Sequence, residues 1–245
     1  MKHLIIAVTA AVVLLSCKKD KQTTAFNKKL TEMKLSNGGY YNFSYNNAGL
    51  ITNASGKFTT TVYQQQKAFE SKHTYLSSGN VYDLKNTVRN ASGKIIYAER
   101  FQNGILFSKV ELNYSPDGYL TKASWSKDGA VSKTELFFFY ENGNLVKITN
   151  HSNGQLTNTY LYEYDLNTLN PLQLDWYEFN QIGHITDDQF GKFSKNLIKK
   201  YKVLDKNGNV FTETQFNFIL DAEGYPVSLD EKANNYNVKY TFKFE

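Results

Sequence analysis

Few of the side chains that can do chemistry lie near one another in this sequence. His184, Asp187 and Asp188 form the one local group whose residue types would suit a metal ion. A structural zinc site needs about four converging ligands and a catalytic site about three. Two neighbouring aspartates after a glycine and a histidine are more typical of the polar end of a hairpin, so we predict no metal here.

Paired carboxylates are the second candidate for chemistry. Glu163 with Asp165, or Glu111 with Asp117, could supply the two acids of a glycosidase, but spacing along a chain sets no distance between carboxyl groups. The sequence also has no nucleophile elbow, no phosphate loop and no cysteine-histidine pairing. We therefore expect a protein that is not an enzyme and that uses no cofactor.

Cys17 is the single cysteine, and it follows directly on a short apolar run. Lys2 and His3 make a basic start, and the twelve residues from Leu4 to Leu15 are too few to span a bilayer as a helix, which needs about 20. A basic start, an apolar core and small residues before a cut are the parts of a secretory signal. An ordinary signal peptide with an incidental cysteine is the alternative.

The tetrapeptide Leu14-Leu15-Ser16-Cys17 resembles the lipobox of bacterial lipoproteins, in which the signal is cleaved just before an acylated cysteine. The resemblance implies that Cys17 is lipidated, and that Lys18, where an aspartate would retain the protein in the inner membrane, allows export to the outer membrane. Its periplasmic and surface faces both stay open. We expect a signal peptide at 1–16, a lipidated tether at 17–25 and one β-repeat domain at 26–245.

The charge of the chain excludes a nucleic-acid partner. Removal of residues 1–16 takes away Lys2 and no acidic residue, so the net charge falls from +5 to +4. Nucleic-acid binders concentrate basic residues on one face, whereas here lysine and glutamate are scattered. The one lysine cluster could meet anionic headgroups, although a solvated strand face explains it better; its members are Lys192, Lys195, Lys199, Lys200, Lys202 and Lys206.

Aromatic and β-branched residues dominate the composition, with 18 Tyr, 17 Phe and only three Pro. These are strand formers. With no second cysteine, no disulfide can form within the chain, and the fold has to rest on an apolar core.

Glycines recur with a period of 25 residues. They stand at 79, 93, 104, 118, 129, 143 and 154, so the spacings alternate between 14 and 11. Most follow Asn, Asp or Ser, and Asn-Gly and Asp-Gly supply the positive φ of tight hairpin turns. Each period therefore predicts two antiparallel strands, with Gly104, Gly118, Gly129, Gly143 and Gly154 at or beside the turns.

The period continues with one interruption. Gly183 comes 25 plus 4 residues after Gly154, and the four extra residues fall near Asn167 to Gln173. Residues 50–76 fit the period poorly. At the front, Phe26, Leu30 and Met33 could lie on one face of a helix, but residues 30–35 also alternate in polarity and lead into a hairpin, so we favour a strand.

Four segments share a tyrosine before a turn and an apolar residue after it: Tyr45 to Leu50, Tyr114 to Leu120, Tyr140 to Leu145, and Tyr164 to Asn167. They resemble the Tyr-Asp-x-x-Gly-x-Leu units of YD-repeat (Rhs-type) proteins, and also the lipid-anchored β-repeat proteins of unknown function in the Bacteroidota. The resemblance implies a meander of hairpins and no catalytic residue.

The predicted fold is all-β: a continuous antiparallel meander of roughly 16 to 18 short strands that rolls into a curved or barrel-like sheet, because large twisted sheets rarely stay open beyond about 10 strands. Residues 136–140 are apolar on both faces, so we expect that part of the sheet to be covered on both sides. A transmembrane barrel is disfavoured, since its strands need about 9–11 residues with one clean apolar face.

Two functions fit this fold. The first is an envelope binding or scaffolding module that contacts a protein or glycan through exposed aromatics, with Trp125, Trp176 and Tyr177 as candidates. The second is a carrier that holds a lipid or other apolar ligand against a concave aromatic face. A filled, elongated structure would favour the module, whereas a cavity of several hundred Å³ lined by Phe and Leu would favour the carrier.

Overall fold

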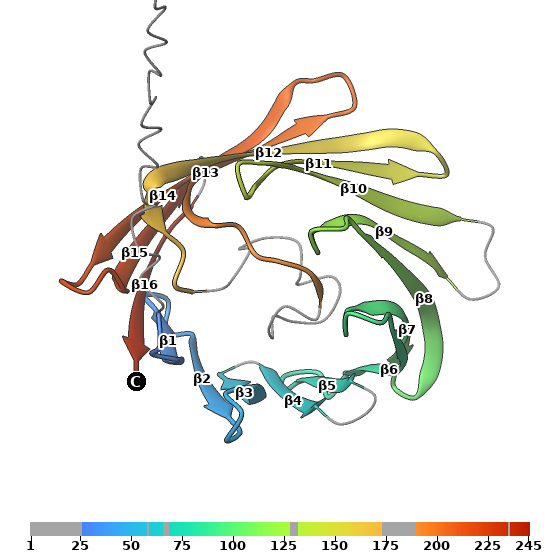
Figure 1. Ribbon diagram of the computed structural model, residues 1–245, viewed down its shortest axis with the longest axis horizontal. Coiled ribbons are helices and arrows are strands. Elements are labelled where there is room, and N and C mark those ends of the chain that lie inside the picture. Colours follow the sequence, from blue (N-terminus) through green and yellow to red (C-terminus); the bar gives the residue numbers. More distant parts are fainter. Residues whose placement is uncertain (1–25, 58, 66–68, 128–131, 173–189, 235) are drawn as a thin grey trace, which may run out of the picture.

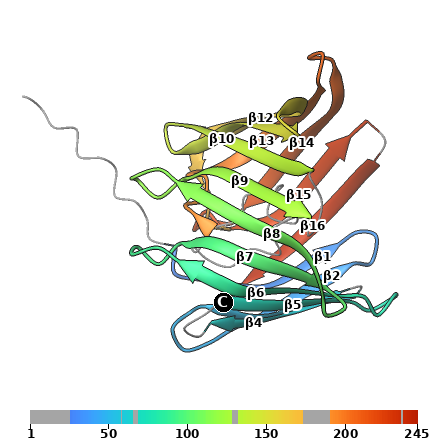
Figure 2. The ribbon, with the colours of Figure 1, turned by 90° about the vertical axis from the view of Figure 1, so that its right-hand side faces the viewer.

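The structure is a computed structural model that describes residues 26–57, 59–65, 69–127, 132–172, 190–234 and 236–245. Sixteen antiparallel strands form a closed barrel in which each strand pairs with its neighbours in sequence and β1 pairs with β16 (Figures 1 and 2). The described part contains no α-helix, and so no helical segment in it could cross a membrane. The predicted all-β meander is confirmed, and the sheet is closed.

The strands in chain order are β1 Leu30–Leu35, β2 Tyr40–Tyr45, β3 Ile51–Gly56, β4 Thr59–Gln65, β5 Phe69–Tyr75, β6 Val81–Arg89, β7 Ile95–Gln102, β8 Ile105–Tyr114, β9 Leu120–Lys127, β10 Lys133–Glu141, β11 Asn144–Ser152, β12 Gln155–Leu169, β13 Asn196–Asp205, β14 Val210–Leu220, β15 Pro226–Ala233 and β16 Tyr236–Phe244. Residues 30–35 are thus a strand. We call the end of the barrel where β1 begins and β16 ends the N-terminal rim, and the other end the opposite rim.

The turns explain why asparagine, aspartate and glycine recur. At the opposite rim, Asp205 Oδ1 accepts hydrogen bonds from the backbone N–H groups of Asn207 and Asn209 at 2.8 and 2.9 Å, and Gly208 follows with φ +87°. Asn46, Asn90 and Asp221 hold equivalent turns at the N-terminal rim. The predicted turn glycines that the structure describes all have positive φ: Gly104 +81°, Gly118 +86°, Gly143 +80° and Gly154 +78°. Gly129 lies outside the described residues.

One face of the strands forms the core inside the barrel. Leu112 and Ala123 lie opposite each other on β8 and β9, with Leu136 next to them on β10, and all three are at most 3% exposed. Leu172 and Phe190 also belong to this core. The segment 190–195, which leads into β13, runs inside the ring of strands (Figure 1).

The other face of the strands carries charge. On it Lys122 pairs with Glu135 at 2.7 Å, and Lys200 and Lys202 both pair with Glu213, at 3.1 and 3.3 Å. Further charges on this face include Lys109, Glu111, Asp230 and Lys239, which alternate with inward residues or lie opposite one another on the ladders. The outer face of the wall therefore carries charged side chains on several of its strands.

Phe137 and Phe139 are exceptions on this outer face, and they differ from the expectation of a covered sheet. No second layer of the described chain packs on them. Instead, Lys122 Nζ lies 5.0 Å from the Phe137 ring centroid and Lys147 Nζ lies 4.2 Å from that of Phe139, which is 43% exposed. The lysine side chains therefore cover these two rings through cation–π contacts, whereas the sequence pattern predicted a second layer of the protein there.

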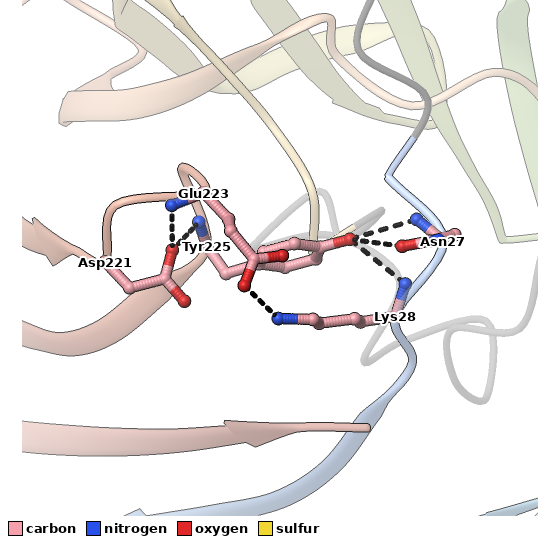
Figure 3. A network of polar contacts seen from close by, with 5 residues as sticks. All are labelled: Asn27, Lys28, Asp221, Glu223 and Tyr225. Atoms are coloured by element: carbon pink, nitrogen blue, oxygen red, sulfur yellow. Dashed lines mark hydrogen bonds and ion pairs between the residues drawn. The ribbon is translucent and has the colours of Figure 1, made fainter.

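The N-terminal segment is fastened to the turn between β14 and β15 (Figure 3). The buried Tyr225 hydroxyl accepts hydrogen bonds from the backbone N–H groups of Asn27 and Lys28 at 2.9 and 3.0 Å. Lys28 Nζ forms an ion pair of 2.6 Å with Glu223, and Asp221 holds the turn itself. The chain therefore enters the barrel beside this turn, on the N-terminal rim.

A candidate binding cleft in the barrel wall

β12 ends in a bulge. Asp165 pairs with Leu197, but the next pair is Leu169 with Asn196, so residues 166–168 loop out of the ladder. The Asn196 side-chain amide donates to the carbonyl oxygens of Leu166 and Thr168 at 3.2 and 3.0 Å. Four extra residues were predicted near Asn167 to Gln173, and the bulge lies where that stretch begins.

β13 and β14 are no longer hydrogen-bonded to each other near the N-terminal rim. Their ladder runs from Leu204 and Val210 to Lys200 and Gln215, whereas β14 continues to Leu220. Beyond Gln215, the β14 residues from Phe216 onward pair with β15, and the start of β13 pairs with β12. The wall of the barrel is therefore split between two strands that are neighbours elsewhere.

A cleft of about 590 Å³ occupies this split. Leu197 and Phe216 are each 3% exposed and form its floor, whereas Leu166 is 69% exposed and stands at its edge. The full lining is Tyr164, Asp165, Leu166, Asn167, Thr168, Leu197, Ile198, Lys199, Phe216, Asn217, Phe218 and Leu220. Such a lining, apolar in its depth and polar at one margin, suits an apolar or amphiphilic molecule.

The polar margin of the cleft is held in place by local hydrogen bonds. Asp165 accepts from the Thr168 hydroxyl at 2.7 Å and from the Asn167 backbone N–H at 3.1 Å. These two bonds, with the nearby charge of Lys199, hold the pKa of the Asp165 carboxyl below its ordinary value. The margin thus carries a fixed carboxylate and the ammonium of Lys199.

The segment Phe190–Lys195 closes the rim beside the cleft. Its backbone N–H groups at Lys192 and Lys195 donate to the carbonyl oxygens of Gly118 and Gly143 at 3.1 and 2.9 Å. Ser194 Oγ accepts from the Leu145 N–H at 3.1 Å and lies 3.0 Å from the Tyr164 hydroxyl. The contact with Ser194 therefore fixes the position of the Tyr164 side chain, which lines the cleft.

A second hollow, of about 420 Å³, lies on the same rim between the turns at 90–93 and 115–118. Its polar side chains already serve the turns: Asn90 accepts from the N–H groups of Ser92 and Lys94, and Ser115 accepts from that of Tyr119. The cleft between β13 and β14 is the better candidate because Leu197, Phe216 and Phe218 of its lining are apolar side chains that hold no turn by hydrogen bonds.

Of the residues singled out from the sequence for chemistry or binding, Asp165 lines the cleft, and the others that the structure describes lie elsewhere. Trp125 lies opposite Val110 on the inner face and packs, half-buried, against the core. Glu163 and Asp165 are exposed on β12, and Glu111 and Asp117 are exposed on β8 and in the following turn. Four groups fall outside the described residues: Cys17, the pair Trp176 and Tyr177, His184, and the pair Asp187 and Asp188. In the described ranges, no three His, Cys, Asp or Glu side chains gather as a metal site would need.

The cleft residues on β13 and β14 were missed by sequence reasoning. Phe216, Phe218 and Leu220 alternate like any inward strand face, so nothing in their pattern separates them from core. The one available signal was the four-residue interruption of the 25-residue period, which marks the strands beside the cleft.

The solved structures that share this fold include two porin-like proteins. A porin-like protein from Bacteroides uniformis matches with a TM-score of 0.66 at 15% identity, over 88% of this chain and 98% of that one. A porin-like protein from Bacteroides vulgatus matches with a TM-score of 0.55 at 13% identity, over 89% and 99%. No protein-family model matches the chain, and no curated protein matches its sequence. At these identities the likeness establishes the class of fold, a closed β-barrel.

Proposed function

We propose that this protein is a lipid-anchored binding protein of the bacterial outer membrane that holds an apolar or amphiphilic ligand in the cleft between β13 and β14. The cleft carries the proposal: its volume of about 590 Å³ lies within the usual range for small-ligand sites, and Leu197, Phe216 and Phe218 supply an apolar bed. Of the two functions weighed from the sequence, the carrier is the one that such a cavity favours. We expect no bond-making activity.

The position of the N-terminal segment supports the same proposal. Leu220 of the cleft is followed directly by the turn that holds Asn27 and Lys28 (Figure 3). If Cys17 is acylated, the nine steps from it to Phe26 reach at most about 30 Å when extended. The anchor would then keep the cleft close to the bilayer, from which an apolar ligand could come. The Bacteroides origin of both structural neighbours agrees with this setting.

The charged outer face explains how a barrel could work at a membrane without crossing it. A lysine or arginine facing lipid near the bilayer midplane costs about 2–4 kcal/mol, and ion pairs such as Lys122 with Glu135 stand on the middle of the wall. We propose that the anchor alone enters the bilayer and that the barrel stands in water.

A binding experiment tests the carrier. The purified protein is titrated with the fluorescent fatty acid cis-parinaric acid, and lipids that copurify from envelope extracts are identified by mass spectrometry. The double variant F218A/L220A should bind the fatty acid with an affinity at least about fivefold lower, because a contact worth roughly 1 kcal/mol is lost. Phe211→Ala is the matched control, since Phe211 lies on the same strand but is 76% exposed. Equal binding by all three proteins would contradict the proposal.

A protein partner is the second candidate, because the split leaves a margin of β14 from Phe216 to Leu220 that pairs with β15 on one side and borders the cleft on the other. An extended peptide could add there as a strand. Crosslinking from a photoreactive residue at Asn217, followed by mass spectrometry of envelope material, distinguishes the two candidates: a crosslinked peptide supports the partner, and a crosslinked lipid supports the carrier.

A further inference from the structure

Arg100 is a charged residue on the inner wall of the barrel, far from the cleft. On β7 it lies between Leu84 of β6 and Ser108 of β8, which are 3% and 2% exposed. It stands three residues before the turn Asn103-Gly104, so it is close to the opposite rim. The chain has only two arginines among its 28 basic residues, so lysine is the usual choice elsewhere in the sequence.

Arg100 has no ion pair within the part of the chain that the structure describes. Its Cζ atom lies 5.8 Å from the centroid of the Phe107 ring. Tyr82 and Tyr75 are the polar side chains that interact electrostatically with its guanidinium. The neighbouring carboxylates do not serve it, because Glu99 on the outer face is bonded to Asn86 and Tyr97, and Asp83 is paired with Lys85. Burial lowers the pKa of the Arg100 guanidinium, although arginine keeps its charge.

Ser108, next to Arg100, also has a polar group that is not satisfied by the described residues. Its Oγ atom is buried and has no hydrogen-bond partner among the described residues. Ser108 and Arg100 are directly opposite on the ladder, so their Cβ atoms are about 4.5–5.5 Å apart. A buried hydroxyl and a poorly paired guanidinium side by side are unusual, since groups of both kinds are nearly always satisfied.

The inner wall deals differently with an anion. Glu231, on β15, is 6% exposed, and its two carboxylate oxygens accept hydrogen bonds from the hydroxyls of Tyr236 and Tyr240 at 2.5 and 2.6 Å. The barrel thus supplies donors to a buried carboxylate, yet among the described residues no ion pair forms with Arg100 and no hydrogen bond forms with Ser108 Oγ.

We propose that Arg100 and Ser108 form a binding site for an organic oxyanion, a carboxylate or a phosphate group. The planar guanidinium can donate two parallel hydrogen bonds to such a group, and the Ser108 hydroxyl can donate a third. The rings of Tyr75, Tyr82 and Phe107 flank the site and would contact the organic part of the ligand. Tyr75 is 44% exposed, so the ligand can arrive from the opposite rim. The site is independent of the cleft between β13 and β14.

The presence of only two arginines allows a direct test. Protein with isotope-labelled arginine shows two side-chain Nε–H signals in its nitrogen-proton spectrum, and Arg89→Lys assigns them. Arg89 is the internal control, because its Nη1 donates to the Gly93 carbonyl at 2.8 Å. Acetate and methyl phosphate are titrated as probes, with acetamide as the uncharged match of acetate. We expect a saturable shift of the Arg100 signal with the anions, in the range of about 1 mM, and none with acetamide.

Variants decide whether the two residues act together. Ser108→Ala removes an unsatisfied hydroxyl, so it should leave folding intact and weaken the preferred anion by about tenfold. Arg100→Lys keeps the positive charge but loses the paired donors of the planar guanidinium, so the affinity measured by calorimetry should also fall by about tenfold. The proposal is overturned if acetamide shifts Arg100 as acetate does, if no shift saturates, or if S108A binds like the unchanged protein. The tighter of the two probes identifies the oxyanion.

Discussion

Three tyrosine hydroxyls close the open ends of hairpins from inside the barrel. Tyr45, Tyr114 and Tyr164 stand at or near the ends of β2, β8 and β12, and they donate to the carbonyl oxygens of Leu30, Ile95 and Leu145 at 2.7, 2.6 and 2.8 Å. These are three of the four tyrosines of the repeated turn segments; the ring of the fourth, Tyr140, packs against that of Tyr119. Their recurrence therefore has a structural cause, which explains why no partner needs to be invoked for them.

Removal of one hydroxyl should measurably destabilise the barrel. Tyr114→Phe keeps the ring and deletes the hydrogen bond to the Ile95 carbonyl, so the free energy of unfolding should fall by about 1 kcal/mol. Urea unfolding followed by tyrosine fluorescence measures it. Tyr40→Phe is the control, since Tyr40 is 42% exposed and the change should be negligible there; equal effects at both positions would contradict the assigned role.

The same burial makes stability depend on high pH. Burial raises the pKa of Tyr45 to about 12 and also raises that of Tyr114 above its ordinary range. Because the folded state then holds these protons more tightly than the unfolded state, stability is complete below about pH 10 and falls as the pH rises toward 12. Phenolate absorbance measures the ionisation, and unfolding at each pH measures the loss. Stability that stays constant from pH 10 to 12 would refute this.

At the scale of elements, each hairpin is built by its turn. In the turns that start at Asn46, Asn90, Asp205 and Asp221, the first side chain accepts from the turn's own N–H groups and the glycine three residues later takes a positive φ. In the turns Asn103-Gly104, Asn142-Gly143 and Asn153-Gly154, both residues have positive φ. Repetition of such turns gives consecutive antiparallel hairpins, which follow one another round the barrel.

A side chain at one of these glycines should strain the turn. Gly118→Val places a β-branched residue at φ +86°, which should cost about 1–3 kcal/mol in unfolding free energy. Asp117→Val is the matched control: it makes the same side chain in the same turn, at an exposed residue whose φ is not positive. Chemical denaturation compares the two, and a control variant as unstable as Gly118→Val would show that another property of valine is responsible.

At the scale of the whole molecule, the proposed arrangement depends on the distribution of charge over the barrel wall. Lysine and glutamate alternate with core residues on the wall, so burial in lipid would be costly at many positions. The barrel resembles porin-like proteins in its fold, and its outer face carries ion pairs such as Lys122 with Glu135 and Lys200 with Glu213.

The chain that starts at Lys18, without signal and cysteine, should therefore be soluble. We expect it to elute as a single species in size-exclusion chromatography without detergent, and the full chain to partition into membranes through Cys17. Circular dichroism checks that the shortened chain contains β-structure. A shortened chain that stays folded only in detergent would indicate that lipid contacts the wall, and would overturn the proposed arrangement.

Much of the fold could be predicted from the sequence because its causes are local. Glycine after Asn or Asp sets each turn, and alternation sets each strand, so the hairpins and their approximate number follow from the spacing of residues such as Gly104 and Gly118. Trp125 shows the limit of this reasoning: it was a candidate for partner binding, and an indole reads the same in sequence whether it faces a partner or, as here, the core.

Tertiary structure alone decided closure, the cleft and the arginine site, since all three depend on register. Leu35 opposite Tyr240 joins the first strand to the last, across more than 200 residues. The cleft exists because the β13–β14 ladder stops at Gln215. Arg100 meets Ser108 because the β7–β8 ladder shifts by one residue between Arg100 and Phe101. A slip of one residue turns every side chain to the other face of a strand, and no local pattern in the sequence fixes that choice.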